Sequence, residues 1–129
     1  MTHILELYKC KICENIVEVA RCGAGNLVCC DEIMKLVEEQ IAPVDDAHFA
    51  YIEKLDEITY KIHFNHPMTQ EHHFEFIEVI SYDKKYVKRK HLKVDEMPEL
   101  SFKCECKEGF YVRLHCNIHG CWVTKSEVK

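Results

Sequence analysis

The sequence lacks an excess of basic residues, a long apolar run and any internal repeat or low-complexity segment. Lys and Arg number 17 against 22 Asp and Glu, and a net charge of −5 at pH 7 argues against nucleic acid as a partner. No apolar run approaches the ~20 residues of a membrane-spanning helix, so we expect no membrane association. The first seven residues lack the basic region, apolar stretch and cleavage site of a secretory signal, so we expect a cytoplasmic protein.

Cysteine and histidine, by contrast, are abundant, with nine of each in 129 residues. In a secreted chain so many cysteines would predict a disulfide framework. Here the number of cysteines is odd, no secretory signal is present, and the spacings are those of metal ligands. The composition therefore favours metal binding over disulfide cross-linking.

The chain divides into two predicted domains, residues 1–37 and 45–129, joined by a linker at 38–44 that contains Pro43. The first domain is too small to fold on a hydrophobic core alone, because below ~40 residues a metal or disulfides usually supply the missing stability. The second domain is predicted to be a small antiparallel β-sandwich, since short apolar runs recur at close spacing.

Several segments of the second domain show strand patterns. Residues 58–64 alternate apolar and polar side chains, and residues 73–80 are rich in aromatic and β-branched side chains. Residues 100–106 and 110–114 flank a turn and predict a hairpin. The charged run at 86–90 predicts an edge strand. The overall prediction is a mainly β chain.

The first cysteine group combines a Cys-x-x-Cys pair with two adjacent cysteines. Four thiolates suit a tetrahedral Zn or Fe site, and we predict the ligands Cys10, Cys13, Cys29 and Cys30. Adjacent side chains of a strand point to opposite faces, so the backbone must kink at the second pair for both sulfurs to bind one metal. We expect this kink to distort the tetrahedron, which favours iron, although a structural zinc site remains the alternative. Cys22 is expected to be a spare thiol.

The second group combines one cysteine with several histidines. His66 and His72 flank a turn containing Pro67, Cys116 and His119 flank a second turn, and His48 could add a further imidazole. One sulfur with several imidazoles fits a redox-active iron or copper centre better than a closed structural zinc site. We expect ordinary solvated or hydrogen-bonded roles for the other histidines, His3, His63, His73, His91 and His115.

These motifs, taken in order, resemble those of the desulfoferrodoxins, the two-iron form of superoxide reductase. Residues 8–36 resemble the desulforedoxin-like N-terminal domain, His66-Pro67-Met68 with His72 resembles the central motif, and residues 116–122 resemble the C-terminal motif. The resemblance implies a distorted rubredoxin-type iron centre held by the four cysteines. It also implies a catalytic iron in an immunoglobulin-like β-sandwich, with Cys116 as axial ligand and an equatorial set of His48, His66, His72 and His119.

The implied reaction is the one-electron reduction of superoxide to hydrogen peroxide, without formation of dioxygen. An axial thiolate pushes electron density onto the iron and favours this transfer. The resemblance also implies an external electron donor such as rubredoxin, and a homodimer. Two other readings are a non-catalytic iron electron carrier and a zinc-stabilised binding module.

The sequence departs from the family pattern just before the first histidine ligand. Many members have Glu-Lys-His there, whereas this chain has Asp46-Ala47-His48. Two interpretations of Asp46 stay open, the carboxylate that caps the ferric iron and a solvated turn residue. The missing lysine at Ala47 is expected to slow the capture of superoxide. We expect Cys104 and Cys106 to be core residues in preference to a disulfide, and Cys121 to pack beside the iron ligands.

Overall fold

The computed structural model describes residues 1–126, which form strands and turns with no helix. In that range no helix is long and apolar enough to cross a membrane. The chain divides into two compact units, Met1–Glu38 and Glu39 onward. In chain order the strands are β1 (Leu7–Lys9), β2 (Ile16–Glu18), β3 (Val28–Cys29), β4 (Glu32–Ile33), β5 (Lys35–Leu36), β6 (Glu39–Ile41), β7 (Tyr51–Lys54), β8 (Thr59–His63), β9 (Phe74–Ser81), β10 (Val87–His91), β11 (Glu99–Lys103), β12 (Phe110–Cys116) and β13 (Gly120–Lys125).

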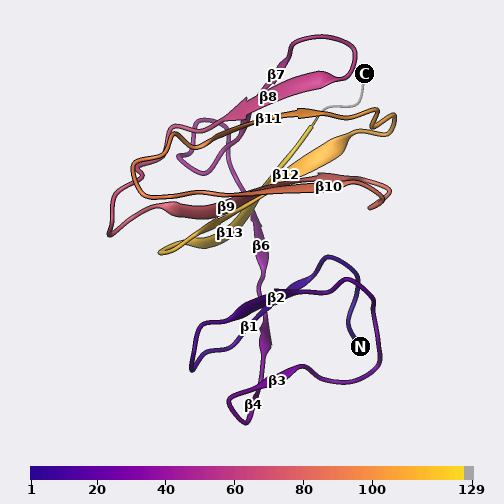
Figure 1. The fold of residues 1–129 in the computed structure, drawn as a ribbon, viewed down its shortest axis with the longest axis vertical. Helices are drawn as coiled ribbons and strands as arrows, with labels where there is room; N and C mark the ends of the chain where they lie inside the picture. The colour runs from indigo at the N-terminus through magenta and orange to yellow at the C-terminus, as the bar shows by residue number, and fades with distance from the viewer. Residues whose placement is uncertain (127–129) are drawn as a thin grey trace. The chain divides into compact units, whose positions relative to one another are not determined.

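The first unit contains a three-stranded sheet, in the order β2-β1-β5, and the short hairpin of β3 and β4 (Figure 1). Cys30 and Asp31 form the two-residue turn of the hairpin, with φ angles of 54° and 59°. Positive φ at both turn positions is the mark of a type I′ turn, whose twist matches that of the strands. Few side chains of this unit are fully buried, so its apolar core is small.

The second unit is a two-sheet β-sandwich, as the sequence predicts. One sheet has the order β10-β9-β12-β13-β6 and the other the order β11-β8-β7, and Figure 1 shows the two layers facing each other. Every pairing is antiparallel except that of β6, which runs parallel to β13. Strand β6 lies in the segment predicted as linker. Its three side chains are all exposed, so no hydrophobic pattern marks it, and backbone pairing alone makes it a strand.

The predicted hairpin of residues 100–106 and 110–114 is wrong. Strand β11 pairs with β8, whereas β12 lies between β9 and β13 in the other sheet. Alternation shows which face of a strand is buried but not which strand pairs with it, because both sheets turn an apolar face to the same core. The predicted edge strand is confirmed, since β10 pairs with β9 alone among the described strands.

The core lies between the two sheets. It consists of buried apolar side chains from both layers, chiefly Ala50, Ile62, Phe64, Met68, Phe74, Ile77, Val79, Leu100, Phe102, Phe110, Val112 and Leu114, together with the sulfurs of Cys104 and Cys116. Elsewhere on the larger sheet, Arg113 of β12 is 1% exposed and its Nε donates to Oε1 of Glu78 on β9 at 2.9 Å. The second oxygen of Glu78 accepts from Arg89 at 3.0 Å, so this buried carboxylate is neutralised by two guanidinium groups.

Candidate metal centres

The four cysteines of the first unit lie together, with all four sulfurs within 4.8 Å of one another. The sulfurs of Cys13 and Cys29 are 3.5 Å apart, and those of Cys29 and Cys30 are 3.9 Å apart. The left-handed backbone of Cys30 explains the second distance, because it breaks strand alternation and turns both adjacent sulfurs to one side. This is the kink that the sequence requires.

Four thiols this close cannot all ionise unless a cation is present. The backbone N–H of Cys13 is the main cause that lowers the pKa of Cys10 to about 7. Hydrogen bonding with Cys13 is the main cause that raises the pKa of Cys30 to about 12, and it also raises the pKa of Cys29. A lowered pKa at Cys10 beside raised pKa values at Cys29 and Cys30 is the pattern expected before a metal displaces the remaining protons. The group therefore fits a metal with four sulfur ligands.

The histidines and the single cysteine of the second unit meet at loops that join the strands. The donor atoms of His48, His66, His72 and Cys116 lie within 4.8 Å of one another. His119 completes the cluster, with its Nδ1 3.7 Å from Sγ of Cys116 and its ring centroid 4.9 Å from that of His72. Sγ of Cys116 also lies 3.6 Å from Nε2 of His66. The structure thus brings together all five donors that the resemblance implies.

Hydrogen bonds to Nδ1 of two histidine rings, His48 and His66, determine that Nε2 is the nitrogen that faces the cluster. Nδ1–H of His66 donates to the carbonyl of Pro67 at 2.7 Å, and Nδ1–H of His48 donates to Asp46 at 2.8 Å. Each ring therefore turns a lone pair on Nε2 towards the other donors. Nε2 of His48 and Nε2 of His72 are buried and have no hydrogen-bond partner among the described residues. A buried nitrogen without a hydrogen-bond or metal partner destabilises the folded protein, and a metal ion is the partner that fits these two nitrogens.

Burial also favours the neutral form of His66 and of His72. It lowers the pKa of His66 to about 4, with smaller contributions from His72 and His48, and it lowers the pKa of His72. Metal ligation needs neutral imidazole, so no proton has to be displaced from these two rings at neutral pH. His48, His66 and Cys116 are buried, whereas His72 is half-buried and His119 is exposed, so the cluster is open to solvent on the side of His119.

Aromatic side chains and one asparagine hold the donors in place. His66 stacks on Phe74 of β9 with ring centroids 3.9 Å apart, and His48 stacks on Trp122 of β13 at 4.6 Å. Nε1 of Trp122 also donates to the carbonyl of His119. Asn117 accepts from the backbone N–H of His73 at 2.9 Å and so ties the β12–β13 turn to the loop after β8. The sequence did not indicate these supports, although Asn117 and Trp122 lie inside the C-terminal motif.

Asp46 contacts His48 on the Nδ1 side of the ring, whereas the buried Nε2 is the atom without a partner among the described residues. Its Oδ1 accepts from both Nδ1 and the backbone N–H of His48, each at 2.8 Å. These bonds, the backbone one first, lower the pKa of Asp46, so the carboxylate is ionised at neutral pH. Two lysines of the following strands have other surroundings: Lys61 pairs with Glu99, and Lys54 lines a cavity around Cys104 and Cys106.

The remaining cysteines have three different environments. Cys104 and Cys106 are joined by a disulfide, so the expectation that both are simply core residues is wrong. The hydrophobic pattern correctly indicates that Cys104 is buried, but two thiols on one face of a strand end can also bond to each other. Cys22 is an exposed free thiol, and Cys121 is buried beside the β12–β13 turn.

Comparisons with known proteins agree with this geometry. The family model of the desulfoferrodoxin N-terminal domain matches residues 2–37, and that of desulfoferrodoxin matches residues 38–125. A desulfoferrodoxin homolog from Methanothermobacter thermautotrophicus is 40% identical over 131 residues, covering 95% of this chain and 99% of its own. A desulfoferrodoxin from Desulfarculus baarsii is 40% identical over 126 residues, covering 95% and 97%.

Among solved structures, the superoxide reductase from Treponema pallidum superposes with a TM-score of 0.72 at 24% identity, covering 94% of this chain and 98% of its own. This likeness shows a shared fold. The family matches and the curated relatives together extend over nearly the whole chain, including both donor clusters. The chain therefore belongs to the desulfoferrodoxin family.

Proposed function

We propose that this protein is a superoxide reductase, which reduces superoxide to hydrogen peroxide by one electron without forming dioxygen. The observation that carries the proposal is the cluster of four imidazoles and one buried thiol, in which Nε2 of His48 and Nε2 of His72 have no partner among the described residues. His48, His66, His72, His119 and Cys116 would hold an iron, which would supply the single electron that superoxide takes up.

The residues of the cluster suit an anionic substrate. Four neutral imidazoles and one thiolate bring a single negative charge, so a divalent cation there leaves a net charge of about +1, which attracts an anion. Buried His48, His66 and Cys116 exclude water from one side of the cluster, and the exposed edge at His119 leaves a way in for a small substrate. We propose Cys116 and His48 as catalytic ligands and Asp46 as the residue that orients His48.

Each donor cluster lies within one unit of the chain, which supports two separate metal-binding domains at residues 1–37 and 45–129, one iron in each. The test is iron content in matched variants. Cys116→Ser should lose one iron per chain and abolish superoxide decay in pulse radiolysis, whereas Cys13→Ser should lose the other iron and keep that decay.

The same experiment separates the alternatives. Two irons per chain with peroxide formed and no dioxygen released support the reductase. Iron held at the four cysteines alone, with no superoxide decay, would instead indicate a non-catalytic electron carrier. Zinc in place of iron would indicate a binding module.

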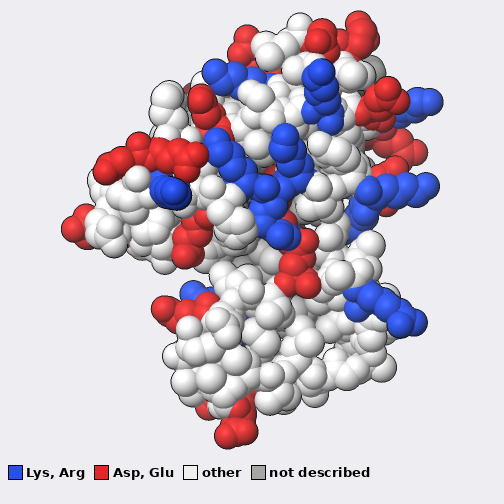
Figure 2. All heavy atoms as spheres, in the orientation of Figure 1, with Lys and Arg blue, Asp and Glu red and all other residues white. Residues whose placement is uncertain are grey.

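We also propose that a small redox protein such as rubredoxin supplies the electron. Exposed cations gather on β10 and its flanks, at Lys84, Lys85, Lys88 and Lys93, and Figure 2 shows a group of basic side chains on the visible face of the second unit. Such a patch attracts an acidic partner. Electron transfer from reduced rubredoxin should slow with rising salt, and K84E/K85E should remove that dependence; an unchanged salt dependence would exclude this patch.

A homodimer is the proposed assembly, because the first unit exposes apolar side chains that a second copy would cover. Ile12, Val28, Ile33 and Leu36 are 47–63% exposed in a unit with a small core. Analytical ultracentrifugation of the whole protein and of V28K/I33K distinguishes a dimer from a monomer. A cytoplasmic location stays a prediction, which the seven free thiols support.

A further inference from the structure

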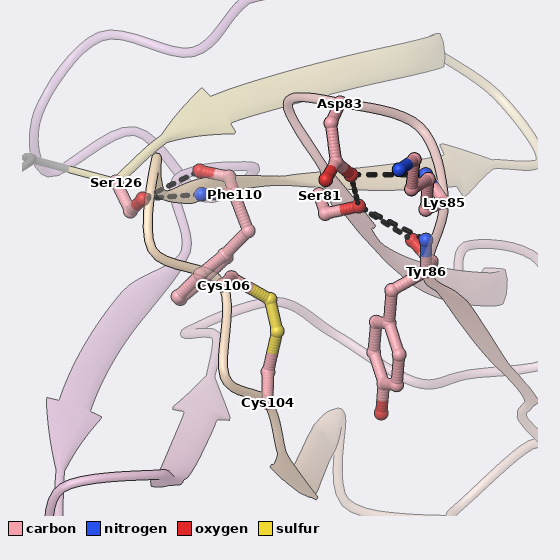
Figure 3. The surroundings of a disulfide bond; sticks show 8 residues. All are labelled: Ser81, Asp83, Lys85, Tyr86, Cys104, Cys106, Phe110 and Ser126. Carbon is pink, nitrogen blue, oxygen red and sulfur yellow. Dashed lines mark hydrogen bonds between the residues drawn. A yellow bond between two sulfur atoms is a disulfide. The ribbon is translucent and has the colours of Figure 1, made fainter.

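Cys104 and Cys106 belong to neither donor cluster; their disulfide lies in the segment that leads from β11 of one sheet to β12 of the other (Figure 3). Its Cα atoms are 5.2 Å apart, within the ordinary range for a disulfide. Strand β12 begins at Phe110, near this bond, and ends at Cys116 in the metal cluster. The two cysteines therefore form a separate sulfur site just before the start of β12, the strand whose other end carries Cys116.

A stabilising role does not account for this bond. A disulfide stabilises mainly by closing a loop in the unfolded chain, and a bond between residues two apart closes almost none. Hydrogen bonds already hold the segment at both ends. The backbone N–H of Cys104 donates to Ile58 at 2.7 Å, and that of Gly109 donates to Cys106 at 2.9 Å. Ser126 binds the backbone of Phe110, which fixes the start of β12 (Figure 3).

The two sulfurs differ in access to solvent. Cys104 is 7% exposed and belongs to the core, whereas Cys106 is half-buried. Both line a cavity of about 750 Å³, large enough to admit small molecules. Lys54, Lys107 and Lys125 also line it, together with the carboxylates of Glu57 and Glu105, so the lining is charged and polar around the half-buried Cys106. One accessible sulfur backed by a buried partner is the arrangement of a nucleophilic and a resolving thiol.

We propose that Cys104 and Cys106 form a redox-active pair whose dithiol form reduces hydrogen peroxide. The inference rests on the proposed function for its source of peroxide, since superoxide reduction would supply that oxidant in the same molecule. Cys106 is the attacking thiol and Cys104 the resolving thiol. The structure corresponds to the oxidised state of the pair.

The reaction balances in two steps. The thiolate of Cys106 attacks one peroxide oxygen, the O–O bond breaks, and Cys106 sulfenic acid and hydroxide form. The thiol of Cys104 then attacks the sulfenic sulfur, the S–S bond forms, and the oxygen leaves as water. In sum, one dithiol and one hydrogen peroxide give one disulfide and two waters. An external dithiol returns the pair to its reduced form by thiol–disulfide exchange and is itself oxidised to a disulfide.

The chain provides a direct assay of this pair. Trypsin cuts after Lys103 and Lys107, which isolates the pair in the peptide 104–107 with no other cysteine. Iron-loaded protein is reduced with dithiothreitol, freed of reductant, treated with one equivalent of hydrogen peroxide, quenched with N-ethylmaleimide and digested. We expect the peptide to pass from the doubly labelled form to the unlabelled disulfide roughly ten times faster than exposed Cys22 loses its label.

Variants assign the two roles. In Cys104→Ser, Cys106 should persist as a sulfenic acid that dimedone traps, and in Cys106→Ser, Cys104 should stay reduced. Neither variant should change superoxide decay, because neither residue lies in the metal cluster. A pair that oxidises no faster than Cys22, or that dithiothreitol does not reduce in the folded protein, would overturn the proposal.

A second arm replaces added peroxide with a flux of superoxide. Oxidation of the pair that catalase prevents supports peroxide made by the iron site as the oxidant. If superoxide yields no peroxide but added peroxide still oxidises the pair, the proposed reductase function fails and the dithiol chemistry stands. Oxidation by superoxide that catalase does not prevent would contradict peroxide as the substrate.

Discussion

Replacing Asp46 by Asn should weaken metal binding at the histidine cluster, because it removes a charge and leaves the shape of the side chain. The Asp46 carboxylate accepts two hydrogen bonds of 2.8 Å from His48, and one of them fixes the ring tautomer that leaves Nε2 free for a metal. The asparagine carbonyl still accepts hydrogen bonds but no longer supplies a negative charge beside the imidazole.

The size of the effect follows from charge and exposure. A hydrogen bond to a charged group contributes about 1.5–3 kcal/mol, but the Asp46 side chain is 36% exposed, so solvent screening reduces this value. A loss of about 1.4 kcal/mol corresponds to tenfold weaker metal binding. This is the low end of the roughly 10–100-fold range for residues that orient a metal-binding histidine. Asp46→Ala should weaken binding further, because it also removes the acceptor for the backbone N–H of His48.

The assay is competition with a chelator at pH 7, measured separately for the ferrous and ferric protein. Nitrogen NMR of the metal-free protein reports the tautomer of His48 independently of activity. Asp45→Asn is the matched control, because Asp45 accepts from the Tyr51 hydroxyl at 2.7 Å and does not contact the donors. Unchanged affinity in both oxidation states with an unchanged tautomer would refute the reasoning. A loss confined to the ferric state would show instead that Asp46 is a direct ligand of ferric iron.

Three further predictions concern stability, each measured by urea unfolding. Glu78→Ala should cost about 3 kcal/mol, the low end of the range for a broken buried pair, because buried Arg113 loses this carboxylate and keeps the longer 3.4 Å contact with Glu39, and a cost below 1 kcal/mol would contradict this. Burial raises the pKa of Tyr111 to about 12 from 10, so its contribution is complete below pH 10 and is lost between pH 10 and 12. That loss is about 2 kcal/mol after screening, and Tyr111→Phe should remove it from the alkaline slope. Gly120→Ala should cost about 1–2 kcal/mol, because Gly120 has a φ of 81°, and unchanged stability would show that the β12–β13 turn relaxes.

The metal donors could be predicted from the sequence, because metal ligation uses few residue types and these lie at short spacings. Cys10-x-x-Cys13 and Cys116-x-x-His119 each place two donors on one turn, so local geometry alone brings them close. The β character of the chain was equally readable, since side chains alternate along a strand whatever its partner. These features depend on residues that are close together in the sequence, so the sequence alone predicts them.

The pairing of the strands could not be predicted from the sequence. The sequence offered no reason why β11 should pair with β8 and not with β12, because either arrangement buries the same apolar face. It likewise hid β6, whose exposed side chains carry no pattern. Pairing of this kind depends on contacts between distant segments that the whole sandwich selects at once.

The sequence by itself determined which residues could bind metal, that the chain is built of strands, and which family it resembles. Only the tertiary structure decided which side chains hydrogen-bond to those donors or stack on them. It placed Asp46 on the Nδ1 side of His48, stacked His66 on Phe74, and bonded Cys104 to Cys106 just before the start of β12. The physical reason is that a ligand set is a matter of chemical type, whereas orientation, burial and access depend on how separate strands pack together.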